Sequence, residues 1–259
     1  MELPTKITKA KTVNPGIMLL YGPHKVGKTE ICSQLPNHFI MQLEPRGSDC
    51  VDAVSMDING PKLFNEVLST LEAATTKLYD YLIVDTMTKL DEWSSMVGTY
   101  NYMSKSAGKK FNRDDKGVLI PYGDVRFEDV NTLPNGYGYI HSRNAVLNWY
   151  DRIEAIHAKG IVTHVILLAH IKDKYTTNET DEVNTKAINM TGKLPDILCS
   201  RVDAVCAFYR KGKEGALNFD NDYKIVSGSR SKHLDGEIII SEKLENNDIK
   251  TFWERVYLK

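Results

Sequence analysis

The sequence lacks the features that mark several protein classes. Its four cysteines show no C-x-x-C spacing and have no histidines at zinc-ligand offsets, which argues against a metal cluster or a disulfide framework. No apolar run approaches the ~20 residues needed to cross a membrane. Residues 1–14 carry lysines but no apolar core of a signal peptide, and look like a lead-in to the domain. We therefore expect a protein of the reducing cytoplasm that does not contact a membrane.

The sequence also lacks an excess of charge of either sign. The 259 residues include 33 lysines and arginines and 34 aspartates and glutamates, which gives a net charge of −1. The net charge gives no indication of nucleic-acid binding, so any contact with DNA would have to come from local basic patches. Internal repeats, low-complexity segments and linkers are also missing. This length suits one large α/β domain better than two.

One motif is clearly present, at residues 22–29. These residues match G-x-x-x-x-G-K-[ST], the phosphate-binding P-loop, and directly follow an apolar run at 17–21. Glycines at both ends of the loop allow successive N–H groups to turn toward a polyphosphate. Lys28 can reach the β- and γ-phosphates, and Thr29 can bind Mg²⁺ at the start of a short helix over 29–35. The alternative is a glycine-rich turn that binds nothing. The expected nucleotide-binding residues are Gly22, Pro23, His24, Lys25, Val26, Gly27, Lys28, Thr29 and Glu30.

Three further apolar strands lead into polar residues. A strand at 38–43 precedes Glu44, one at 81–85 ends in Asp85, and one at 163–169 precedes His170. Ligands of doubly wound sheets bind at the carboxyl ends of parallel strands, so these side chains are expected to converge on the P-loop. Asp85 stands where a Walker B carboxylate would hold Mg²⁺ together with Thr29. A lone histidine at a strand end is more often structural, and Glu44 could be a surface glutamate.

The rest of the chain alternates between patterned and irregular stretches. Helices are expected at 63–78, 140–158, 192–200 and 249–257, and further strands at 53–57, 202–209, 223–227 and 237–241. The closely spaced late strands favour antiparallel additions to the sheet. Residues 98–138 lose periodicity and interleave cations with aromatics, an arrangement that could bind single-stranded DNA or pack on its own domain. Residues 172–191 are polar and are expected to form a second loop.

The order of these pieces resembles the RecA-like branch of P-loop ATPases. Within it, the chain is similar to the small phage-type ATP-binding proteins, several of which act in single-strand annealing or strand exchange. The resemblance implies one RecA-like domain over 1–259, with a mainly parallel sheet, helices on both faces and antiparallel C-terminal strands. It further implies that Glu44 activates the attacking water, that His170 senses the γ-phosphate, and that 172–191 is a DNA-binding loop.

The resemblance also implies an assembly and an activity. Arg230 and Lys232 are similar to the residues that complete the site of a neighbouring subunit, so a homo-oligomer, either a ring or a filament, is expected. The expected catalytic residues are Lys28, Glu44, His170, Arg230 and Lys232. The function expected is a Mg²⁺-dependent ATPase that acts on single-stranded DNA in phage-type recombination or annealing. A nucleotide-gated DNA-binding or scaffold protein with little turnover, and a P-loop kinase of a small substrate, remain as alternatives.

Overall fold

A single mixed β-sheet forms the centre of the molecule. The computed structural model describes residues 13–105, 116, 136–177, 182–220 and 226–259. The strand order is β11-β10-β8-β7-β1-β5-β4-β2-β3, with β6 beside β5 and β9 beside β7. The strands are β1 (Ile17–Gly22), β2 (His38–Gln42), β3 (Ser55–Asp57), β4 (Tyr79–Asp85), β5 (Val162–Thr177), β6 (Glu182–Ile188), β7 (Ala204–Lys211), β8 (Glu214–Asn218), β9 (Gly228–Ser229), β10 (Glu237–Lys243) and β11 (Ile249–Thr251).

The central strands run parallel and the late ones antiparallel. β1 pairs in parallel with β5 and β7, and β4 lies parallel between β5 and β2. β8, β10 and β11 add antiparallel strands to the β7 side. This arrangement confirms the predicted α/β sheet with antiparallel strands near the C-terminus.

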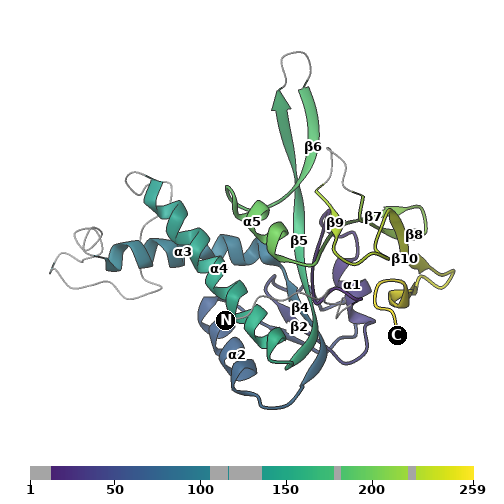
Figure 1. Cartoon of the computed structure of the whole chain (residues 1–259), viewed down its shortest axis with the longest axis horizontal. Coiled ribbons are helices and arrows are strands. Elements are labelled where there is room, and N and C mark those ends of the chain that lie inside the picture. The colour runs from purple at the N-terminus through teal and green to yellow at the C-terminus, as the bar shows by residue number, and fades with distance from the viewer. Residues whose placement is uncertain (1–12, 106–115, 117–135, 178–181, 221–225) are drawn as a thin grey trace, which may run out of the picture.

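Helices cover both faces of the sheet, as predicted (Figure 1). Alternate residues of β1 point to opposite faces, so Leu19 belongs to one core cluster and Leu20 to the other. The first cluster lies under α2 (Pro61–Ala73), α3 (Met87–Ser104), α4 (Tyr137–Ala158) and α5 (Leu194–Arg201). The second lies under α1 (Lys28–Ser33) and the 3₁₀ turn η3 (Trp253–Arg255). No helix in the described part of the chain is long and apolar enough to span a membrane.

The prediction of an irregular stretch over 98–138 is wrong at both of its ends. α3 continues to Ser104 and α4 begins at Tyr137, so both ends of the 98–138 stretch are helical. Tertiary packing explains the difference, because Gly98 of α3 lies directly against Ser142 of α4 and the two helices run on together. Residues 106–115 and 117–135, which hold most of the cations of this stretch, lie outside the described residues.

The prediction of a loop at 172–191 is wrong. β5 continues past His170 to Thr177, and β6 returns antiparallel to it, so that the two form a long hairpin standing out from the sheet (Figure 1). The sequence hid this hairpin because its polar residues give no apolar alternation, whereas backbone hydrogen bonds hold the pair. The tip, 178–181, lies outside the described residues, as does most of the predicted strand at 223–227.

The predicted C-terminal helix at 249–257 is also wrong, and the strands β8 and β11 were missed. Residues 249–251 form β11, which is followed by η3. The helix-like spacing of Trp253 and Val256 reflects packing on α1, where Trp253 Nε1 donates to the carbonyl of Ile31 at 2.7 Å. β8 escaped prediction because it directly follows the Gly212 turn, and its strand pattern is only five residues long.

Candidate functional site

The P-loop connects β1 to α1 and wraps around its own lysine. Gly27 adopts a left-handed conformation with φ of 101°, and a Cβ at Gly22 would lie 2.4 Å from the carbonyl oxygen of Phe208. Both glycines are therefore required by the backbone. Lys28 is only 5% exposed, and its Nζ donates to the carbonyls of Gly22 at 3.0 Å and Pro23 at 2.8 Å. Burial lowers the pKa of Lys28 to about 8.

Thr29 and Asp85 are directly hydrogen bonded. The Thr29 hydroxyl donates to Asp85 Oδ2 at 2.6 Å, and Asp85 is 4% exposed at the end of β4. Burial raises the pKa of the Asp85 carboxyl above its usual value. A hydroxyl beside a buried carboxylate is the oxygen donor set that Mg²⁺ accepts, and the cation would compensate the buried charge. Among the described residues, no group of three or more His, Cys, Asp or Glu could hold a metal alone. The Thr29 hydroxyl and the Asp85 carboxylate therefore fit two of the oxygen ligands of a Mg²⁺ ion.

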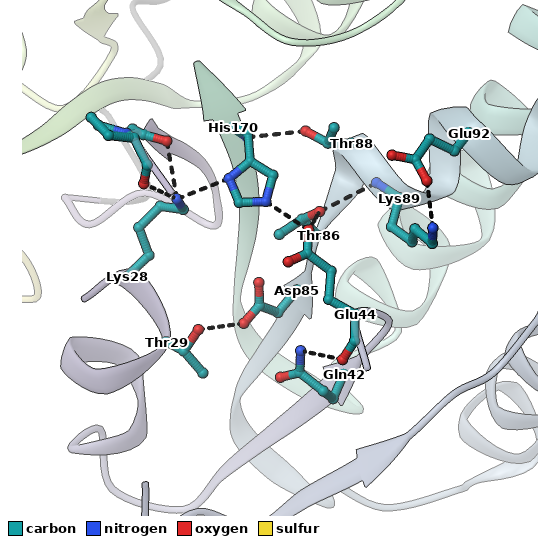
Figure 2. A network of polar contacts seen from close by, with 12 residues as sticks. Lys28, Thr29, Gln42, Glu44, Asp85, Thr86, Thr88, Lys89, Glu92 and His170 are labelled. Carbon is teal, nitrogen blue, oxygen red and sulfur yellow. Dashed lines mark hydrogen bonds and ion pairs between the residues drawn. The ribbon is translucent and has the colours of Figure 1, made fainter. Parts of the chain in front are cut away.

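Glu44, His170 and Lys28 form a continuous chain of contacts (Figure 2). His170 Nε2 lies 2.6 Å from Glu44 Oε1, and His170 Nδ1 lies 3.3 Å from Lys28 Nζ. The Thr86 hydroxyl donates to the same Glu44 oxygen at 3.0 Å. The hydrogen bond from His170 lowers the pKa of Glu44 below its usual value, against the effect of burial. Glu44 is therefore held as a carboxylate at neutral pH.

His170 is fixed from two further sides. Its backbone N–H donates to the Thr88 hydroxyl at 3.0 Å. Its ring stacks on the ring of His24 from the P-loop, with centroids 3.6 Å apart and planes at 23°. Burial lowers the pKa of His24 below its usual value. The imidazole of His170 is consequently 5% exposed and has a defined orientation.

These residues surround one cavity of about 510 Å³ at the carboxyl ends of the parallel strands. The predicted convergence of P-loop, Glu44, Asp85 and His170 is thus observed. The cavity is lined by Lys25, Gly27, Lys28, Thr29, Glu30, Gln42, Glu44, Pro45, Arg46, Gly47, Cys50, Val51, Asp85 and His170. The remaining predicted residues of the P-loop do not line the cavity. The carbonyls of Gly22 and Pro23 accept hydrogen bonds from Lys28, and the ring of His24 stacks on that of His170. The carbonyl of Val26 accepts a hydrogen bond from outside the loop.

A family model described as "AAA domain" matches residues 14–231, which include the whole of this site. The chain belongs to the AAA-domain family of P-loop ATPases. No curated protein matches the chain. Among solved structures, the chain is similar to the crystal structure of the RadB recombinase, with 12% identity and a TM-score of 0.45. The similarity covers 93% of this chain and 92% of that one.

Two predicted residues lie away from the cavity of the AAA domain. Arg230 Nη2 donates to the carbonyl of Ser200 at 2.8 Å, and Nη1 lies 3.3 Å from Asp203 Oδ1. The Asp203 carboxylate accepts from the N–H of Ile17, where β1 begins, so Arg230 lies at the end of the parallel strands opposite to the P-loop. Lys232 follows it and is exposed. Neither residue reaches the cavity of its own chain, and their role toward a neighbouring copy stays a prediction.

Two residues of the AAA domain escaped the sequence analysis. Arg210 on β7 donates from Nε to the carbonyl of Val26 at 2.8 Å. Gln42, only 1% exposed at the end of β2, donates from Nε2 to the carbonyl of Glu44 at 3.1 Å and so supports that turn of chain. Gln42 carried a weak signal, as a polar residue inside a buried strand. Arg210 carried none, because its contact depends on β7 lying beside β1.

Proposed function

We propose that this AAA domain binds ATP with Mg²⁺ and hydrolyses it while acting on single-stranded DNA, as a RecA-like ATPase of the phage recombination or annealing type. The observation that carries the proposal is the contact chain Lys28–His170–Glu44 beside the Thr29–Asp85 pair. It unites in one cavity the groups that phosphoryl transfer to water requires.

Nucleotide binding would use the P-loop as its phosphate cradle. Lys28 would move from the loop carbonyls to the phosphates, and Thr29 and Asp85 would hold Mg²⁺. The ion would neutralise charge that develops on the phosphate oxygens. Because Lys28 is buried among polar groups in a preformed loop, little ordering is left to be done when a triphosphate binds.

Hydrolysis would use Glu44 to position and deprotonate a water molecule. The hydrogen bonds described for its carboxylate both fall on Oε1, from His170 and Thr86. The second oxygen is available to a water in the cavity that Glu44 lines. With its pKa held low by His170, Glu44 acts mainly by orienting the water, which suits a reaction governed by positioning.

His170 would relay the state of the nucleotide to the β5–β6 hairpin. The histidine touches Lys28 and Glu44, and it belongs to the strand that continues into the hairpin. When Glu44 shifts toward the attacking water, its hydrogen bond with His170 changes, and this favours a different position of β5. This gives the hairpin two arrangements that depend on bound nucleotide.

The DNA part of the proposal is supported by a second cavity at the base of the hairpin. It measures about 470 Å³ and is lined by Asp91, Tyr139, Ser142, Arg143, Thr191, Gly192, Lys193 and Leu194. Within the described ranges, Arg143 and Lys193 form no ion pair, whereas Asp91 already accepts from the backbone and hydroxyl of Thr191. Two such cations with the exposed ring of Tyr139 suit a phosphate and a stacked base. In the hairpin itself, Lys186 is paired with Asp173.

The proposal includes an oligomer in which Arg230 and Lys232 reach the cavity of a neighbouring copy. The position of Arg230, at the end of the parallel strands opposite to the P-loop, supports such a head-to-tail arrangement. In that case, adding the Lys28→Ala protein should rescue part of the activity of Arg230→Ala in mixed assemblies, since each mutant supplies what the other lacks. Additive activities at all mixing ratios would reject the shared site.

The experiment that tests the function is phosphate release with and without single-stranded DNA at two salt concentrations. We expect release that DNA stimulates, with a stimulation that fades as salt rises, because phosphate contacts release counterions. Arg143→Ala combined with Lys193→Ala should lose the stimulation but keep the basal rate. Lys28→Ala should lose binding or turnover, and Lys213→Ala, an exposed lysine on the β7–β8 turn, is the control.

Other outcomes would assign a different function. Tight ATP binding without phosphate release would indicate a nucleotide-gated scaffold. Phosphate transferred to an acceptor other than water would indicate a kinase. An unchanged rate in Lys28→Ala would reject this site altogether.

A further inference from the structure

Arg210 anchors the P-loop from outside the cavity. It lies near the end of β7, the strand beside β1, and its Nε donates to the carbonyl oxygen of Val26 at 2.8 Å. Its Nη2 lies 3.4 Å from Glu30 Oε2 on α1, so the guanidinium bridges the loop and the helix that follows it. The side chain is 27% exposed and is not among the residues that line the 510 Å³ cavity.

This contact determines which way one peptide group faces. In a trans peptide the C=O and the N–H of the same unit point in opposite directions. The carbonyl of Val26 points toward Arg210, so the N–H of Gly27 points away from Arg210, and Gly27 itself is one of the residues that line the cavity. The N–H groups of a P-loop are the donors that bind phosphate oxygens.

The same peptide would otherwise turn easily. Gly27 has no side chain to restrict its backbone, and its φ of 101° lies in a region that glycine enters and leaves at little cost. A Cβ at this position would lie 2.6 Å from Arg210 Nη2, so the glycine also makes the room that the guanidinium occupies. The loop thus combines a freely rotating peptide with one external anchor.

We propose that Arg210 is a positioning residue that fixes the Gly27 N–H toward the cavity and thereby sets the affinity for the β- and γ-phosphates of a nucleotide. The inference rests on the proposed nucleotide binding. It makes a residue outside the P-loop contribute to the specificity of the site for nucleoside di- and triphosphates. Glu30 supports the anchor, because its carboxylate holds the second nitrogen of the guanidinium in place.

The first test measures nucleotide affinity and turnover separately. Loss of one charge-assisted hydrogen bond should raise the dissociation constants of ADP and ATP about tenfold in Arg210→Ala. The rate at saturating ATP should change less than about twofold, since Arg210 is not among the residues that line the cavity. AMP, which lacks the β-phosphate, should bind both proteins equally. Arg210→Lys keeps one donor and should restore part of the affinity.

Lys211→Ala is the matched control. It removes the neighbouring cation of the same strand, which pairs with Glu237 on the surface, and it should leave every affinity unchanged. A fall in AMP affinity together with that of ADP would show general damage to the domain and overturn the positioning role. Equal ADP affinity in wild type and Arg210→Ala would overturn it as well.

The second test needs no nucleotide, so it separates this inference from the proposed function. In the nucleotide-free protein the Gly27 amide should give one sharp NMR signal. In Arg210→Ala that signal should broaden or double, because the peptide samples two orientations. An identical Gly27 signal in both proteins would refute the anchor. Absence of nucleotide binding by the wild-type chain, with the signal change present, would refute the proposed function alone.

Discussion

The Nε2 atom of His170 lies 2.6 Å from Oε1 of Glu44. The opposite ring nitrogen lies 3.3 Å from Nζ of Lys28, which as an ammonium can only donate. Nδ1 therefore accepts a hydrogen bond from Lys28, and the N–H at Nε2 donates a hydrogen bond to Glu44. One side chain thus connects the phosphate-binding lysine to the carboxylate that would orient water.

The titration of Glu44 should depend on this contact. In His170→Ala the carboxylate loses its main hydrogen-bond donor while its burial remains, so its pKa should rise. A depressed folded-state pKa contributes stability above the unfolded pKa of the group, and this contribution is lost as pH falls through the folded value. The side-chain carboxyl ¹³C shift of Glu44, followed against pH, measures the change. His164→Ala, on the same strand as His170 but near the start of β5, is the control, and identical Glu44 curves in wild type and His170→Ala would contradict the contact.

Asp85 should govern the requirement for Mg²⁺. Asp85→Asn keeps the shape and an acceptor for Thr29 but removes the charge, so the Mg²⁺ concentration for half-maximal phosphate release should rise at least tenfold. Burial raises the pKa of this carboxyl, which means that its charge costs stability at neutral pH. The melting temperature of the nucleotide-free variant at pH 7 should therefore not fall. An unchanged Mg²⁺ requirement would remove Asp85 from the metal site. Asp57→Asn, an exposed residue of β3, controls for surface charge.

The contact of α3 with α4 should be sensitive to one methyl group. A Cβ at Gly98 would lie 2.5 Å from the backbone nitrogen of Ser142, which cannot move away as a flexible side chain can. Gly98→Ala should lower the free energy of unfolding by about 1–3 kcal/mol in urea titrations. Gly60→Ala is the matched control, because Gly60 is extended with no neighbour within 4 Å. Equal stability of the two variants would refute the close packing.

The hairpin should matter to DNA and not to the chemistry. Asp173 and Lys186 face each other across the pair, so residues 174–185 can be replaced by an Asn-Gly turn that joins them. The shortened protein keeps Lys28, Glu44 and His170, and we expect basal phosphate release within about twofold of wild type. Stimulation by single-stranded DNA should disappear. Full stimulation of the shortened protein would exclude the hairpin from DNA contact.

The strand tips of the site could be predicted because they obey local rules. The P-loop is a contiguous motif, and Glu44 and Asp85 follow buried strands in a parallel sheet, whose carboxyl ends share one edge. The register then places His170 opposite Gly22. These relationships need only the order of strands, which hydrophobic patterns reveal.

The missed features depend on packing between distant segments. The β5–β6 hairpin is held by its backbone ladder and shows no apolar alternation. Arg210 meets Val26 across 184 positions of sequence, and nothing near either residue announces the contact. The C-terminal segment follows the surface of α1 and not its own helical spacing, as Trp253 shows.

The most direct test of the account is Glu44→Gln, with ATP binding and phosphate release measured on the same preparations. The substitution keeps the size of the side chain and its ability to form hydrogen bonds. It removes the carboxylate that would orient the water and accept its proton. We predict that phosphate release falls at least 100-fold while the dissociation constant for ATP stays within about threefold of wild type. Phosphate release at the wild-type rate would contradict the assignment of Glu44 and with it the hydrolytic site.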